Sequence, residues 1–214
     1  EGDLEEEIWY DYDLSIRKNS SVEKSLGLSA ASSPGYRGGY KGKLLKRKEY
    51  KEIFDTSRGV ITPGNASPLN AGAATTMIAS EEAVEKYDLK PMAKIIAMGW
   101  AGVPPSVMGR GPVPATEFAL EKAGLSADDI DIWEINEAFA VVVLNCMHHF
   151  DIPREKVNVR GGAIAIGHPL GASGVRLPGT LARILNERKA KYGVATLCCG
   201  SGQGVTTILE NPNI

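Results

Sequence analysis

The chain has 214 residues, of which 43% are apolar and 23% charged, and 24 basic against 26 acidic side chains give a formal net charge of -2. This composition is typical of a globular protein and argues against extended disorder, collagen-like repeats and coiled coils. The near-neutral charge argues against a nucleic-acid binder, and the longest apolar run, residues 138–144, is much shorter than the ~20 residues of a membrane helix.

The first 60 residues differ in pattern from the rest of the chain. An acidic start, with no features of a signal or transit peptide, is followed by a Ser/Pro/Gly-rich stretch at 29–35 and a basic cluster at 41–51. We expect residues 1–60 to be a polar excursion packed on the core or on a partner, and 61–214 to be the folded domain. The basic cluster either contacts a phosphate group or, as is commoner, forms a solvated face.

Strand-like and helix-like patterns alternate from residue 60 onward. Ser80 is a typical N-cap, and Pro112 and Gly124 are typical of a helix start and a helix end. The order β-α-β-α-β-α-β-β predicts an α/β fold with a mixed, mainly parallel five-stranded sheet, helices on both faces and a final antiparallel hairpin at its edge. The expected strands are 72–79, 93–100, 130–135, 193–198 and 204–209, and the expected helices are 80–87, 112–123, 137–150 and a last helix ending near 190.

Two polar loops carry candidate side chains, the first of them directly after an expected strand. Asn136 can hold a water or a carbonyl oxygen at the end of its strand, or it can simply cap the next helix with Glu137 favouring the helix dipole. His168 lies within the glycine-rich loop 161–174, next to a helix N-terminus that lowers the pKa of an imidazole. It is either a general base or a buried structural histidine.

The third loop contains two adjacent cysteines. Cys198 and Cys199 precede alternating glycines whose backbone N–H groups could form an oxyanion hole, although a free cysteine is more often a small apolar residue of the core. Strand alternation puts the two thiols on opposite faces, so only one of them can face a site. With Cys146, the chain has three cysteines, which do not suggest a disulfide framework and fit an intracellular setting.

Together these segments resemble the C-terminal half of the thiolase family. Residues 136–139 match its N-E-A-F motif, 161–174 its G-G-A-x-A-x-G-H-P-x-G-A-S-G signature, and 198–204 its C-x-G-x-G-x-G motif. Residues 62–67 are similar to T-A-G-N-A-S, and 109–115 to the G-x-G-P-V-P-A part of M-G-x-G-P-V-P-A. The resemblance covers about residues 55–214 and implies the fold of one thiolase half.

The resemblance also implies an activity and a set of roles. The activity is thiolytic cleavage of a 3-oxoacyl-CoA by coenzyme A, or the reverse Claisen condensation. His168 would activate the acyl-accepting cysteine and, with a water held by Asn136, line an oxyanion hole. Cys198 would be the acid/base, with Cys199 at a variable position, and the Gly200 N–H would bind the acyl oxygen. The substrate-binding residues would be Ser67 at the pantetheine, Phe139 at the acyl pocket, and Ala138 and Leu69.

The family's nucleophilic cysteine belongs to an N-terminal half, and this chain has no cysteine before Cys146, which we expect in the core. We therefore expect a companion chain or half that carries this cysteine, in a hetero- or homo-oligomer within the cytoplasm or an organelle matrix. Acyl-CoA is the expected substrate, with no permanently bound cofactor, no metal, no nucleic acid and no membrane partner. Pro63 and Pro68 depart from the family pattern beside Ser67.

Two alternatives remain at the level of sequence. The chain could be a non-catalytic scaffold or regulatory subunit that kept the fold, or a relative that condenses acyl groups on another carrier. Retention of Cys198, His168 and Asn136 favours an enzyme over a scaffold. The Cys198 motif favours a thiolase, because decarboxylating condensing enzymes generally have a second histidine there.

Overall fold

A mixed sheet of four strands forms the centre of the part of the chain that the computed structural model describes, residues 21, 24 and 60–214. The expectations for residues 1–59, including the basic cluster, therefore fall almost entirely outside the described residues. The strand order across the sheet is β1-β4-β3-β2. The strands are β1 (Lys94–Gly102), β2 (Ile132–Ile135), β3 (Tyr192–Cys199) and β4 (Gln203–Glu210).

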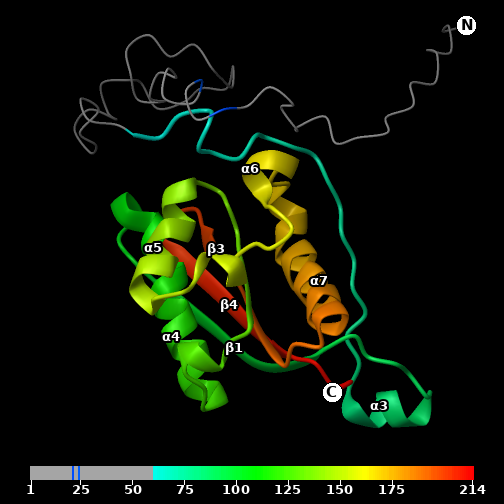
Figure 1. The fold of residues 1–214 in the computed structure, drawn as a ribbon. Coiled ribbons are helices and arrows are strands. Elements are labelled where there is room, and N and C mark those ends of the chain that lie inside the picture. The colour runs from blue at the N-terminus through cyan, green and yellow to red at the C-terminus, as the bar shows by residue number, and fades with distance from the viewer. Residues whose placement is uncertain (1–20, 22–23, 25–59) are drawn as a thin grey trace, which may run out of the picture.

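Helices cover both faces of this sheet, as expected for an α/β fold (Figure 1). Helices α4 (Pro112–Ala123) and α5 (Ala140–Phe150) lie on one face, and α7 (Leu170–Arg188) lies on the other. No helix between residues 60 and 214 combines the length and apolarity needed to cross a bilayer. The remaining helices are α3 (Glu81–Lys86) and α6 (Ala163–Ile166), with 3-10 turns η1 (Pro105–Arg110), η2 (Ala127–Asp129) and η3 (Arg154–Lys156).

Strand alternation divides the buried side chains between two cores. Trp133 and Val194 pack toward α4 and α5, whereas their neighbours Ile132 and Ala195 pack toward α7. The central strand β3 is buried along most of its length because helices cover both its faces. The candidate thiols Cys198 and Cys199 lie at the end of this strand, which helices cover on both faces of the sheet.

Local sequence signals explain several helix boundaries. Helix α4 begins with Pro112 and ends at Gly124, whose φ of 66° lies in the left-handed region that glycine adopts without strain. Ser80 caps α3 by accepting a hydrogen bond from the Ala83 backbone N–H. The helix expected at 137–150 instead begins at Ala140, with Phe139 at its N-cap, so Asn136 does not cap it.

Two features of the sheet differ from the sequence expectation. The sheet is not mainly parallel, because β4 pairs antiparallel with both β1 and β3, and only β2 and β3 run parallel. The last hairpin is also not an edge, because β1 pairs with the outer side of β4 and places it inside the sheet. A short connection places β4 beside β3, but it does not determine what pairs with the other side of β4.

The strand expected at 72–79 is not formed, and the described sheet has four strands rather than five. This segment runs beside α7 toward α3 (Figure 1), with an added Cβ at Gly72 falling 2.8 Å from Pro169. Met77 and Ile78 are 81% and 76% exposed. Small and β-branched residues favour an extended backbone, but a strand also needs a partner with free N–H and C=O groups, and α7 offers none.

Candidate active site

Asn136 lies directly after β2 and is buried, with 1% of its surface exposed. Its backbone N–H donates to the Thr196 carbonyl at 2.9 Å, which continues the pairing of β2 with β3 and fixes the residue in place. Its side-chain Nδ2 lies 3.2 Å from Nε2 of His168. Its Oδ1 is buried without a hydrogen-bond partner among the described residues. The amide therefore faces the histidine, and it has one acceptor available for a further group.

His168 connects α6 to α7 and is held on three sides. Its backbone N–H donates to Asn70 Oδ1 at 3.2 Å, and its ring nitrogens face Asn136 and, at 2.7 Å, the Ser173 hydroxyl. Burial lowers the pKa of His168, and the positive charge of Arg176 lowers it further. The direction agrees with the sequence expectation, but the causes are burial and a guanidinium rather than a helix dipole. The imidazole is therefore neutral at pH 7 and can accept a proton.

Glu137 holds the glycine-rich loop against the sheet. Its Oε1 accepts from Asn158 Nδ2 at 3.1 Å, and its Oε2 accepts from the Ile164 backbone N–H at 3.0 Å. An added Cβ at Gly162 would collide with this carboxylate, which explains the absence of a side chain there. Sequence reasoning assigned Glu137 to the helix dipole and gave Asn158 no role. Two sequence positions could have indicated these roles: Glu137 directly follows Asn136, and Asn158 shortly precedes the glycine pair 161–162.

Cys198 lies near the end of β3 in a small apolar cluster with Ala138 and Val142, and it is 6% exposed. Burial raises the pKa of the Cys198 thiol to about 11, so the group is protonated at pH 7. Cys199 is half-buried, and Cys146 is fully buried in the core under α4 and α5, as expected. No hydrogen bond joins Cys198 to His168 in the described region. Cys198 packs on Ala138, whereas His168 contacts Asn136, two residues before Ala138 in the sequence.

The connection between β3 and β4 presents backbone next to this thiol. Ser201 and Gly202 both have positive φ, at 70° and 97°, which turns the chain sharply after Cys199. A Cβ added at Gly200 would meet no atom within 4 Å, so the space on the Cβ side of this residue is open. Open space beside a turn is a requirement for a backbone oxyanion donor, which must approach its ligand closely.

The expected substrate-binding residues are brought together in part. The Ser67 N–H donates to the Ala138 carbonyl at 3.0 Å, and Ala66 forms an antiparallel bridge with Phe139. Ser67, Ala138 and Phe139 thus line one strip of backbone beside Cys198. Leu69, in contrast, is 79% exposed.

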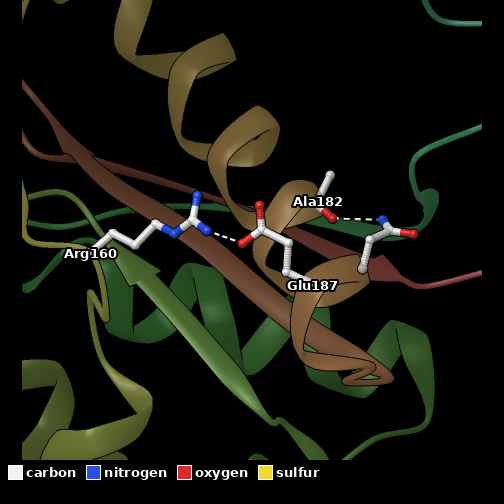
Figure 2. A network of polar contacts seen from close by, with 4 residues as sticks. Arg160, Ala182 and Glu187 are labelled. Carbon is white, nitrogen blue, oxygen red and sulfur yellow. Dashed lines mark hydrogen bonds and ion pairs between the residues drawn. The ribbon is translucent and has the colours of Figure 1, made fainter.

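A buried ionic layer that the sequence analysis missed lies between β2 and α7. Glu134 is 2% exposed, and burial raises its pKa to about 7, although the charge of Arg176 acts in the opposite direction. Burial also lowers the pKa of Arg176. A charged residue inside an otherwise apolar strand was the available signal. Arg160 extends this layer toward the surface by an ion pair with Glu187 on α7 (Figure 2).

These contacts define what the site can do chemically. A buried amide follows β2, a protonated thiol and turn backbone lie at the end of β3, and a neutral imidazole from the connection between α6 and α7 contacts the amide. Such groups are suited to proton transfer and oxygen stabilisation at an acyl carbonyl. Within residues 60–214, no group of three or more His, Cys, Asp and Glu side chains is placed to hold a metal ion.

Comparisons with known proteins show what the chain is similar to. The chain is 43% identical over 205 residues to a 3-ketoacyl-CoA thiolase of Vibrio parahaemolyticus, covering 94% of this chain and 47% of that protein. Crystal structures of human mitochondrial 3-ketoacyl-CoA thiolase in complex with CoA (36% identity, TM-score 0.73) and of Bacillus anthracis acetyl-CoA acetyltransferase (37%, 0.77) each match 93% of this chain and 45% of theirs.

The chain spans about half the length of the curated relatives it matches. The family model that describes the thiolase C-terminal domain matches residues 89–211, which contain Asn136, His168 and Cys198. The chain therefore belongs to the thiolase family, of which it contains the C-terminal domain.

Proposed function

We propose that the chain is the C-terminal part of a thiolase-type acyltransferase, which cleaves a 3-oxoacyl-CoA with coenzyme A or catalyses the reverse Claisen condensation. The observation that carries the proposal is the contact between Asn136 Nδ2 and His168 Nε2, with Cys198 packed on Ala138 close to Asn136 in the sequence. Asn136 and His168 lie 32 residues apart in the sequence, and a fold that served only as a scaffold would not need their contact.

The acyl-accepting cysteine is assigned to a companion half, which here means the thiolase N-terminal half, on the same or another chain. Two observations support this assignment. Residues 72–79 are extended without a partner strand, and Leu170 at the start of α7 is 78% exposed in the same region. Both are surfaces that a second folded half would cover.

The first half of the reaction breaks the bond between C2 and C3 of the substrate. His168 takes the proton of the companion's thiol, and the thiolate attacks the C3 carbonyl. As the C2–C3 bond breaks, its electron pair becomes an enolate, whose oxygen is held by the protonated imidazole and by a water bound to Asn136 Oδ1. Cys198 donates its proton to C2, and acetyl-CoA leaves. The raised pKa of Cys198 favours this acid role.

The second half transfers the acyl group to coenzyme A. The Cys198 thiolate takes the proton of the coenzyme A thiol, and the resulting thiolate attacks the acyl-enzyme. The Gly200 N–H stabilises the oxygen of the tetrahedral intermediate, the companion's sulfur leaves, and His168 returns the proton to it. Loss of one preorganised donor of this kind costs about 3–4 kcal/mol of transition-state stabilisation. Ser67, Ala138, Phe139 and Leu69 are assigned to the pantetheine and acyl chain.

The wider setting follows from this assignment. The assembly is a hetero- or homo-oligomer that uses coenzyme A as a substrate rather than as a resident cofactor. We assign the reaction to fatty acid metabolism, and free cysteines support a location in the cytoplasm or an organelle matrix.

The test combines the purified 214-residue chain with the N-terminal half of the Vibrio parahaemolyticus relative, acetoacetyl-CoA and coenzyme A, and follows the loss of the Mg-enolate absorbance. We expect turnover from the mixture and none from either part alone. His168→Gln should abolish it, and His149→Gln, at an exposed histidine on α5, should not. Turnover by the homogeneous chain alone would contradict the need for a companion half. Coenzyme A binding without turnover would favour a non-catalytic subunit.

A further inference from the structure

Ser173 is a residue of the glycine-rich motif to which the proposed roles give no task. It lies in the first turn of α7 and is fully buried, with 0% of its surface exposed. Its Oγ lies 2.7 Å from His168 Nδ1 and 3.2 Å from the Pro169 carbonyl oxygen, to which it donates. A buried hydroxyl with two partners on one side of a candidate base is placed to orient that base.

The number of hydrogens on Ser173 and on the neutral His168 ring determines which group donates in each of these hydrogen bonds. Ser173 has one hydroxyl hydrogen, which goes to the Pro169 carbonyl, so its oxygen must accept from His168. Nδ1 of His168 therefore bears the ring hydrogen. Since the ring is neutral, Nε2 has a lone pair, and this nitrogen faces the donor Nδ2 of Asn136.

We infer that Ser173 fixes the tautomer of His168, with the hydrogen on Nδ1 and the lone pair on Nε2, and so acts as a positioning residue for proton transfer. The catalytic part of this inference rests on the proposed function, because Nε2 is the nitrogen that would take the proton of the companion's thiol. That thiol must replace the Asn136 amide as the donor to Nε2. A second hydrogen-bonding partner that orients a catalytic imidazole is a general feature of bases that activate a nucleophile.

The test reads the tautomer directly, without turnover. The chain contains three histidines, so ¹⁵N-histidine labelling gives few signals, and His168→Gln identifies those of His168. In the unmodified chain we expect Nδ1 protonated and Nε2 unprotonated at a pH above the pKa of the ring. Ser173→Ala should give a mixture of tautomers, and Ser173→Thr, which retains the hydroxyl, should restore the original one.

Thr116→Val is the matched control, because it also removes a buried hydroxyl with side-chain partners, on α4 rather than beside His168. It should leave the His168 signals unchanged. Protonated Nε2 in the unmodified chain, or a tautomer that Ser173→Ala does not change, would overturn the inference.

Turnover with the companion half separates this inference from the proposed function. If both hold, Ser173→Ala lowers kcat about 10- to 100-fold, as is usual for partners that orient a reactive group, with little change in KM. If Ser173→Ala changes the tautomer but the unmodified assembly shows no thiolysis, the proposed function fails and the control of the tautomer stands. If the unmodified assembly turns over and the tautomer does not respond, only the inference fails.

Discussion

Under α4 and α5 the sheet buries Trp133, Ile135 and Val194, whereas between the same sheet and α7 it buries Glu134 next to Arg176. The two sets of side chains alternate along the same strands. The side under α4 and α5, here called the apolar face, buries only apolar side chains of β2, whereas the side under α7, here called the charged face, buries Glu134 beside a second apolar core. The comparison indicates that the first face mainly stabilises the fold. The second also lowers the pKa of His168 through Arg176, and so couples stability to the site.

The largest expected effect on the apolar face comes from Trp133→Ala. Trp133 is 1% exposed and stacks on Phe150 with ring centroids 5.5 Å apart, so its removal leaves a cavity. We expect a loss of about 3–5 kcal/mol in the free energy of unfolding, measured by urea denaturation. Trp100→Ala, at a residue 64% exposed on β1, is the control and should cost much less. Equal costs would remove the distinction between core and surface.

The charged face should make stability depend on pH through Glu134. Its pKa is about 7 in the folded chain, whereas the ordinary value for a solvated glutamate is 4.5, so the folded state binds its proton more tightly than the unfolded state does. The contribution of Glu134 to stability is therefore fully present below pH 4.5 and is lost as pH rises through about 7, by at most about 3 kcal/mol.

Glu134→Gln should remove this decline, and Glu121→Gln at an exposed position on α4 should not. Urea denaturation at several pH values measures both variants. A decline that persists in Glu134→Gln would show that another group causes it. The pH dependence of stability could then not be assigned to the charged face.

A smaller effect is expected from the hydroxyl cluster within the apolar face. Thr116 Oγ1 lies 2.9 Å from Thr206 Oγ1, which lies 2.7 Å from Thr196 Oγ1, and all three residues are fully buried. Thr116→Val removes one member, while the other two still bond to each other. We expect a loss of about 1 kcal/mol in the free energy of unfolding. A loss as large as that of Trp133→Ala would mean that this face depends on polar contacts as much as on apolar packing.

The smallest effect should come from the outer end of the charged face. Arg160 and Glu187 form an ion pair (Figure 2), but both side chains are 47% exposed. Arg160→Met should cost less than about 1 kcal/mol, and the difference should vanish in 1 M salt. Denaturation at low and high salt checks this. A larger loss of unfolding free energy that salt does not reduce would mean that Arg160 has a structural role in holding the glycine-rich loop 161–174.

Local signals predicted the elements whose boundaries depend on local chemistry. Helix α4 begins and ends where Pro112 and Gly124 indicate, and the hairpin of β3 and β4 follows from the glycines between them. The prediction of a strand at 72–79 was wrong because a propensity for extended backbone does not specify a pairing partner. The prediction that the last hairpin lies at the edge of the sheet was wrong for a related reason, since the pairing of β1 with β4 joins segments about 100 residues apart.

The candidate site was predictable to a similar extent. Asn136 and His168 are in contact although they lie on two separate loops, as the resemblance implied, and strand alternation separates Cys198 from Cys199. The roles of Glu137 and Ser173 depend on where helices begin. Because α5 starts at Ala140 rather than at Glu137, that carboxylate is available to hold the loop. Such one-turn shifts in helix boundaries lie beyond what residue patterns resolve.

The central claim is that Cys198, rather than its neighbour, moves the proton at the carbon next to the thioester. The measurement compares Cys198→Ser with Cys199→Ser in the assembly with the companion half, following acetoacetyl-CoA cleavage and, by mass, acylation of the companion's cysteine by acetyl-CoA. Our account predicts that Cys198→Ser stops cleavage while acylation persists, and that Cys199→Ser retains both. Full cleavage by Cys198→Ser, together with its loss in Cys199→Ser, would contradict the account.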